Sequence, residues 1–133
     1  MPSEVSMAAV DTNVLVRLLV ADDPAQTRRA LAYLEARRPL WVSTVVLVET
    51  VWVLNAVYGW SKAQILAMLE TASNSRDFAF QSVETVRAAI AVYASGKADF
   101  PDCLALELAR AEGHLPFVTF DKATAKLPDA VTP

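Results

Sequence analysis

The stretch from Pro39 to Ser61 constrains the fold of this chain more than any other segment. Its 23 residues are mostly apolar and carry a single charged side chain, Glu49. A membrane span needs about 20 apolar residues, so length alone permits a transmembrane helix. However, a carboxylate near the centre of a bilayer costs roughly 2.5–3.5 kcal/mol, and the polar pair Ser43–Thr44 divides the stretch. We therefore expect a buried strand, Leu40–Val42, and a buried helix, Thr44–Tyr58, with no membrane partner.

Short apolar segments alternate with amphipathic ones along the rest of the chain. This alternation predicts an α/β fold with a parallel sheet. With 133 residues and no repeat, low-complexity stretch or linker, the chain is expected to form one domain, residues 1–133. The expected strands are Val5–Val10, Leu40–Val42, Phe78–Gln81 and Pro116–Phe120. The expected helices are Asn13–Val20, Pro24–Arg38, Thr44–Tyr58, Lys62–Ala72, Val83–Ser95 and Pro101–Glu112, followed by a final short turn.

Local signals mark where several of these helices begin and end. Asp23 followed by Pro24 is typical of an N-cap and a first helical residue. Ser61 and Gln64 have the spacing of a capping box, and Ser82 is expected to begin the helix that follows it. The three glycines each follow a helical pattern, at the position where a left-handed residue ends a helix: Gly59, Gly96 and Gly113.

The composition excludes several classes of protein. Apolar residues make up 54% of the chain and the net charge is −3, which argues against intrinsic disorder and against a polybasic nucleic-acid binder. A single Cys excludes a disulfide framework and a cysteine-based zinc site, and it fits a reducing, cytoplasmic location. A single His excludes a multi-histidine metal site. Any metal that side chains bind must therefore be held by carboxylates.

Two aspartates follow predicted strands directly. Asp11 comes after the first strand and Asp121 after the last one, and ligands of a parallel sheet bind at the carboxyl ends of its strands. Each aspartate could instead cap the helix that follows it. Because two strands end in the same way, we favour a shared site.

Glu49 interrupts a segment that is apolar on every side. Such helices are usually buried, and an isolated buried charge is very costly. Glu49 is therefore expected to be paired with a core cation such as Arg17, or to face a cavity that holds a metal ion. We favour the metal ion.

Asp102 lies in the first turn of the helix that Pro101 begins. The residues that follow it at helical spacing are apolar, so Asp102 is expected on the buried face, although the helix dipole alone would also favour an acid there. Asp99 precedes the helix as a loop acid or as a supporting ligand. Oxygen ligands of this kind suit Mg²⁺ or Mn²⁺. Such a cation relieves the repulsion between carboxylates and can activate a water against a phosphodiester.

The order of these motifs resembles a PIN domain, and specifically a VapC-type toxin of a bacterial toxin–antitoxin pair. The resemblance covers nearly the whole chain and rests on four segments: Asp11–Leu15, Glu49 in its apolar helix, Asp99–Leu104 and Val118–Asp121. It implies a three-layer α/β/α sandwich around a central parallel sheet. It also implies Mg²⁺- or Mn²⁺-dependent endoribonuclease activity on RNA.

The resemblance also assigns roles to individual residues and partners to the chain. The catalytic and metal-binding acids would be Asp11, Glu49, Asp102 and Asp121, and the supporting residues Asn13, Asp99 and Thr119. Members of this family are commonly homodimers, silenced by a cognate VapB-type antitoxin whose tail enters the active-site groove.

RNA binding requires cations near the site. Lys122 and Lys126 follow Asp121 and are the favoured phosphate contacts. The arginines of the second predicted helix are expected to form a solvated face: Arg28, Arg29, Arg37 and Arg38. Two alternatives stay open, a catalytically silent PIN-like interaction module and a housekeeping PIN nuclease without an antitoxin. A receiver-type phosphotransfer domain fits poorly, because Leu40–Val42 ends in Ser43 instead of an acceptor aspartate.

Overall fold

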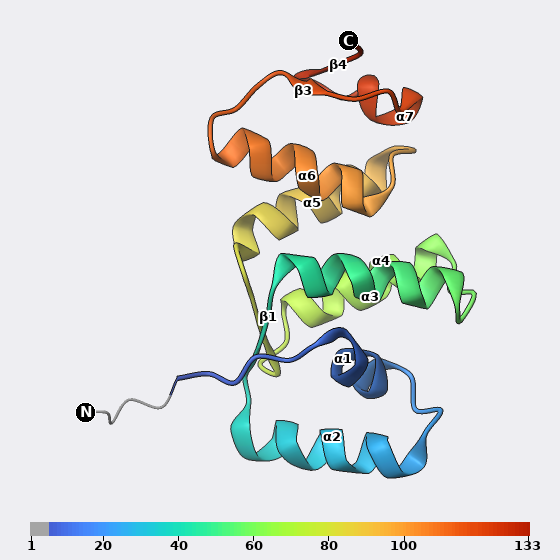
Figure 1. Ribbon diagram of the computed structural model, residues 1–133, viewed down its shortest axis with the longest axis vertical. Coiled ribbons are helices and arrows are strands. Elements are labelled where there is room, and N and C mark those ends of the chain that lie inside the picture. The colour runs from blue at the N-terminus through green and yellow to red at the C-terminus, as the bar shows by residue number, and fades with distance from the viewer. Residues whose placement is uncertain (1–5) are drawn as a thin grey trace. The chain divides into compact units, whose positions relative to one another are not determined.

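The computed structural model describes residues 6–133, which divide into two compact units, one ending at Gln81 and one spanning Ser82–Pro133 (Figure 1). Helices alternate with short parallel strands in the order expected for the α/β class, which confirms that prediction. No helix among these residues is long and apolar enough to cross a membrane.

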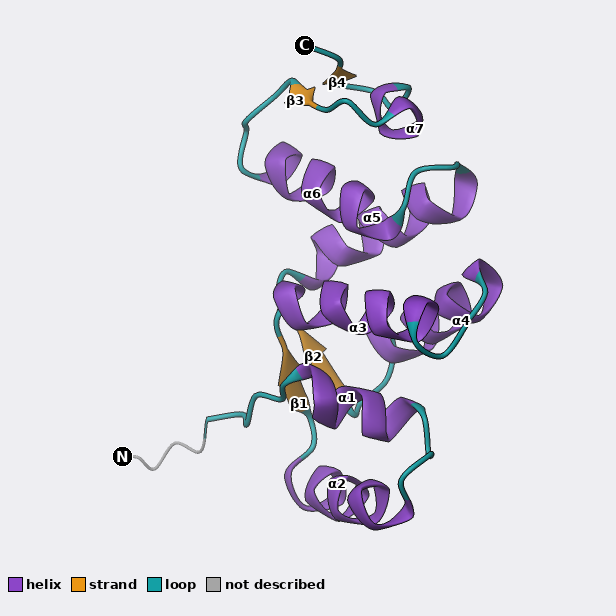
Figure 2. Cartoon of the chain, turned by 45° about the vertical axis from the view of Figure 1, so that its right-hand side comes forward, coloured by secondary structure: helices purple, strands orange, loops and turns teal. Residues whose placement is uncertain are grey.

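The first unit contains four helices and a pair of parallel strands (Figure 2). Leu40 pairs with Phe78 and Val42 with Phe80. Buried leucines from the helices, among them Leu15, Leu47 and Leu54, form the core together with these strands. The elements are α1 (Thr12–Leu19), α2 (Pro24–Arg37), β1 (Leu40–Val42), α3 (Thr44–Ala56), α4 (Lys62–Ser73) and β2 (Phe78–Phe80).

The expected first strand, Val5–Val10, is reduced to a single parallel bridge between Ala9 and Trp41. The Val10 N–H donates to the Trp41 carbonyl at 3.1 Å, and the Trp41 N–H donates to the Ala8 carbonyl at 2.8 Å. Val5, the first residue of that prediction, lies outside the described residues. The bridge still places Asp11, the residue before α1, at the carboxyl end of the short segment that pairs with β1. This is the position that the sequence indicates.

Helix α3 is buried on one side only, so the expectation that it is enclosed on every side is wrong. Leu47, Val51 and Leu54 are buried against the unit's core, whereas Val45 is 68% exposed and Trp52 is 64% exposed. Within this unit α3 packs against α1 and α4. These neighbours cover one stripe of an apolar helix and leave the other stripe open.

The second unit contains two long helices, one short helix and a small parallel sheet. Helix α5 packs against α6, where the rings of Tyr93 and Phe100 meet edge to face at 5.8 Å between centroids. The last strand was not expected, because only a final turn was predicted there. The elements are α5 (Val83–Ser95), α6 (Phe100–Ala111), β3 (Phe117–Val118), α7 (Lys122–Ala125) and β4 (Ala130–Val131).

Candidate active site

Asp11 is the N-cap of α1. One carboxylate oxygen, Oδ1, accepts a hydrogen bond from the Val14 N–H at 3.0 Å. The capping role considered from the sequence is therefore real. It uses one of the two oxygens of an exposed side chain, so capping leaves Asp11 able to bind a further group.

Glu49 is exposed, which contradicts the expectation that it is buried. The reason is that α3 turns this side chain away from the face that packs in the core. The hydroxyl of Thr12 donates to Glu49 Oε1 at 2.7 Å, across the contact between α1 and α3. Because Thr12 follows Asp11 directly, this bond holds Glu49 near the end of α1 where Asp11 lies.

Arg17 does not pair with Glu49, so the ion pair considered from the sequence is absent. The Arg17 guanidinium instead contacts Asp22, in the connection between α1 and α2. Asn13, the expected supporting residue, is exposed in the first turn of α1 and lines a groove that also reaches Asp11.

Asp121 is the N-cap of α7 in the second unit. Its Oδ2 accepts from the Thr124 N–H at 2.9 Å and from the Thr124 hydroxyl at 2.7 Å. These two donors lower the pKa of the Asp121 carboxyl. Thr119 supports the same turn, because its hydroxyl oxygen accepts from the Asp121 N–H at 3.0 Å.

Asp102 is half-buried in the first turn of α6, in agreement with its predicted placement. Burial raises the pKa of the Asp102 carboxyl, and the negative charges of Asp121 and Asp99 raise it further. Asp99 occupies the N-cap position of α6, but its side chain makes no capping hydrogen bond. The second unit therefore places the carboxylates of Asp99 and Asp121 within electrostatic reach of Asp102.

The side chains at these positions fit a hard divalent cation by their chemistry. The candidate residues offer carboxylate, amide or hydroxyl oxygens, and oxygen ligands are those that Mg²⁺ and Mn²⁺ prefer. A cation near Asp102 would offset the repulsion that raises the pKa of that carboxyl. Within either unit, the described residues gather no three His, Cys, Asp or Glu side chains closely enough to hold a metal by themselves.

Two threonines contribute to these clusters without having been singled out from the sequence. Thr12 orients Glu49, and Thr124, which is fully buried, holds the Asp121 carboxylate. Their positions carry a signal: Thr12 follows an aspartate at a strand end, and Thr124 lies three residues after one. Lys122 and Lys126, the expected phosphate contacts, are exposed at the two ends of α7 beside Asp121.

The chain has recognisable relatives. The curated "VapC ribonuclease" of Aquifex aeolicus (strain VF5) is 27% identical over 124 residues, which cover 91% of this chain and 92% of that protein. A solved structure titled "Toxin-antitoxin complex from Klebsiella pneumoniae" is 24% identical, with a TM-score of 0.39 and coverage of 95% and 97% of the two chains. The family model described as "PIN domain" matches residues 8–130. This chain therefore belongs to the PIN domain family.

Proposed function

We propose that this chain is a Mg²⁺- or Mn²⁺-dependent endoribonuclease and that residues 1–133 form a single nuclease domain. The proposal is carried by one observation: in this PIN domain, three of the candidate aspartates lie at or near the start of a helix. Asp11 begins α1, Asp102 lies in the first turn of α6, and Asp121 begins α7. Asp102 is moreover a carboxyl group whose surroundings disfavour its charge, which is the condition that a bound cation relieves.

The proposed catalytic residues are the four acids Asp11, Glu49, Asp102 and Asp121, which would also bind the metal. A divalent cation would supply Lewis-acid chemistry, by making a water more acidic and by stabilising charge on the phosphodiester. Thr12 would hold the Glu49 carboxylate, and Thr119 and Thr124 would hold the turn that carries Asp121. Asn13 and Asp99 would support the site as further oxygen donors.

The wider role that we propose is that of a toxin in a toxin–antitoxin pair. It is supported by the relative from Aquifex aeolicus, which is named a VapC ribonuclease and is matched over nearly its whole length. On this proposal the chain acts in the cytoplasm on RNA, forms a homodimer, and is inhibited by a VapB-type antitoxin. Lys122 and Lys126 would contact RNA phosphates.

The test is cleavage of mixed RNA by the purified protein in Mn²⁺, in Mg²⁺ and in EDTA. Asp102→Asn should lower the rate about a hundredfold or more, because it removes a ligand charge with little change in shape. Glu112→Gln is the matched control, since Glu112 is an exposed acid at the other end of the same helix. Cleavage that persists in EDTA or in Asp102→Asn contradicts the proposed mechanism.

Expression of the chain in a bacterial host separates the remaining possibilities. A toxin arrests growth, and Asp102→Asn relieves the arrest. A housekeeping nuclease cleaves RNA in vitro without arresting growth. A catalytically silent interaction module does neither.

A further inference from the structure

A groove of about 730 Å³ runs between α1 and α2 in the first unit and reaches Asp11 at one end. The two helices are joined by a short connection and pack against each other (Figure 2). Volumes of several hundred Å³ are typical of sites for small ligands. Its polar and aromatic lining consists of Asp11, Asn13, Arg17, Gln26, Arg29 and Tyr33.

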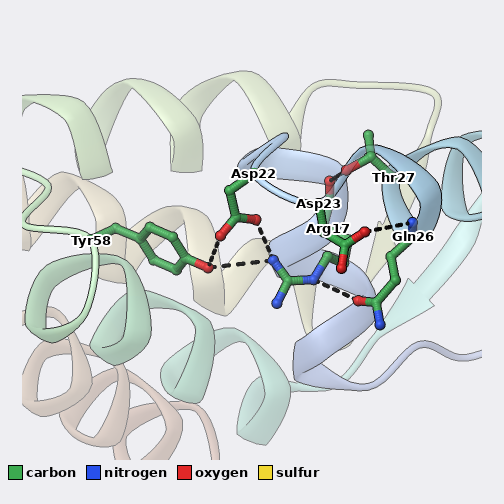
Figure 3. Close-up of polar contacts among 6 residues, drawn as sticks. All are labelled: Arg17, Asp22, Asp23, Gln26, Thr27 and Tyr58. Carbon is green, nitrogen blue, oxygen red and sulfur yellow. Dashed lines mark hydrogen bonds and ion pairs between the residues drawn. The ribbon is translucent and has the colours of Figure 1, made fainter.

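One wall of this groove is fixed by a network around Arg17 (Figure 3). The Arg17 guanidinium contacts Asp22, lies 3.4 Å from the Tyr58 hydroxyl and donates to Gln26 Oε1 at 2.9 Å. The Tyr58 hydroxyl in turn donates to Asp22 at 2.8 Å. The charge of Arg17 is thus neutralised by the protein itself, and Arg17 serves to position α1 against α2.

Arg29 differs from Arg17 in this respect. No acidic side chain in residues 6–133 forms an ion pair with the Arg29 guanidinium. Arg29 lies on the same face of α2 as Gln26 and Tyr33, because the three residues are spaced by three and four positions. The groove lining therefore includes one arginine, Arg29, that pairs with no carboxylate among residues 6–133.

Tyr33 provides an aromatic surface beside this cation. Its side chain is 46% exposed. The Arg37 guanidinium lies over the ring at 5.6 Å from the centroid, and Arg37 Nη1 donates to the Tyr33 hydroxyl at 3.1 Å. These contacts orient the ring. An aromatic ring next to an arginine is the combination with which proteins bind single-stranded nucleic acids, by stacking on a base and by contacting a phosphate.

We propose that this groove binds a nucleotide of single-stranded RNA next to the cleaved bond, with a phosphate on Arg29 and a base on Tyr33. The proposal rests on the proposed function, because that function places the reaction at Asp11. An anionic, base-bearing ligand matches Arg29 and the ordered ring of Tyr33, whereas the Asp11 carboxylate of the same lining is the group proposed to bind the cation. Arg29 and Arg37 are exposed, as expected for the arginines of this helix, and the proposal adds a ligand for Arg29.

The test measures binding separately from cleavage. A fluorescein-labelled single-stranded oligoribonucleotide is titrated in Mg²⁺ with the Asp102→Asn protein, whose substitution lies outside the groove, and fluorescence anisotropy is recorded. Adding Arg29→Gln should raise Kd about tenfold and reduce the slope of log Kd against log salt by about 0.7. The matched control is Arg28→Gln, because Arg28 is the exposed neighbour on α2 and does not line the groove.

Tyr33 is tested in the same assay. Tyr33→Leu should raise Kd about tenfold through lost stacking, whereas Tyr33→Phe, which keeps the ring, should stay within about threefold of the parent. Circular dichroism checks that each variant is folded, and a gel checks that the oligoribonucleotide is intact.

The outcomes distinguish this proposal from the proposed function. Equal effects of Arg29→Gln and Arg28→Gln overturn the groove proposal, as does a parent protein that binds no RNA. An Arg29→Gln protein that binds RNA normally but resists an antitoxin also overturns it, because the groove then serves a protein partner. RNA binding that depends on Arg29, in a wild-type chain that cleaves no RNA in any metal, supports the groove and contradicts the proposed function.

Discussion

The Asp11 carboxylate caps α1 with one of its oxygens, and the same cap geometry recurs at Asp23, which begins α2 and accepts from the Gln26 N–H at 3.1 Å. Asn caps helices about as well as Asp. Asp11→Asn should therefore lower the rate of RNA cleavage about a hundredfold or more. It should shift the thermal midpoint by less than about 2 °C. Initial rates and thermal melts of the purified variants check both parts.

Asp23→Asn is the control for this substitution, because it makes the same chemical change at an equivalent cap outside the proposed metal site. It should leave both the rate and the thermal midpoint near the wild-type values. A comparable loss of rate in the two variants would show that the charge of Asp11 has no special role.

The Asp22 carboxylate makes the stability of the first unit depend on pH. The hydrogen bond from Tyr58 and the charge of Arg17 hold the pKa of the Asp22 carboxyl below its ordinary value of 3.8. A lowered folded-state pKa stabilises the protein above pH 3.8, and this stabilisation is lost as the pH falls from there through the folded-state pKa. The thermal midpoints of wild type and Asp22→Asn should thus differ at pH 6 and converge towards pH 3.

Tyr58→Phe isolates the contribution of the hydroxyl to this pH dependence. It removes the donor to Asp22 and keeps the aromatic ring, so its midpoint should fall between those of the wild type and Asp22→Asn at pH 6. Parallel curves for all three proteins from pH 6 to pH 3 would contradict the role assigned to the Asp22 carboxylate.

The candidate residues divide into those that local sequence could place and those that it could not. Asp11, Asp102 and Asp121 lie at helix starts, as predicted, because capping and strand-end signals depend on near neighbours. The burial of Glu49 was predicted wrongly, since it depends on which side of α3 meets α1 and α4. The contact from Thr12 to Glu49 spans 37 residues and has no local signature.

The helices predicted from the sequence begin within a residue of the predicted positions, but their N-terminal serines do not all act as caps. Ser61 and Gln64 form the expected capping box at α4. Ser82 precedes α5 but has a left-handed backbone, with φ of 51°, and makes no capping hydrogen bond. Ser61→Ala should therefore lower the free energy of unfolding by about 1 kcal/mol, and Ser82→Ala should change it by less than about 0.5 kcal/mol. Urea denaturation of the two variants measures both values, and equal losses would contradict the difference between the caps.

The strands were harder to predict than the helices. Each described strand has only two or three residues, and each pairs with a segment far away in the sequence, as Leu40 does with Phe78. A helix can be predicted from the periodicity of nearby residues. The formation of a strand depends on a pairing partner that the local pattern does not identify. The apolar run before Asp11 therefore reads as a strand, although Ala9 makes only an isolated bridge within the described residues.

The net charge of the whole chain no longer argues against RNA binding once the candidate acids are assigned to a cation site. A net charge of −3, taken alone, disfavours RNA binding. Setting aside Asp11, Glu49, Asp99, Asp102 and Asp121 leaves more basic than acidic side chains. If those five acids serve a cation, the remaining surface tolerates a polyanion, which is consistent with the proposed substrate.

The proposal that residues 1–133 form one domain predicts a single cooperative unfolding transition. Segments as short as Ser82–Pro133 rarely bury enough apolar surface to be stable alone, and the single Cys of the chain provides no disulfide. All three tryptophans lie in the first unit, at positions 41, 52 and 60, whereas far-UV circular dichroism reports the helices of both units. Urea denaturation followed by tryptophan fluorescence and by circular dichroism should give coincident curves. Loss of the tryptophan signal while part of the helical signal persists would show that the two units unfold separately and that the chain is not one domain.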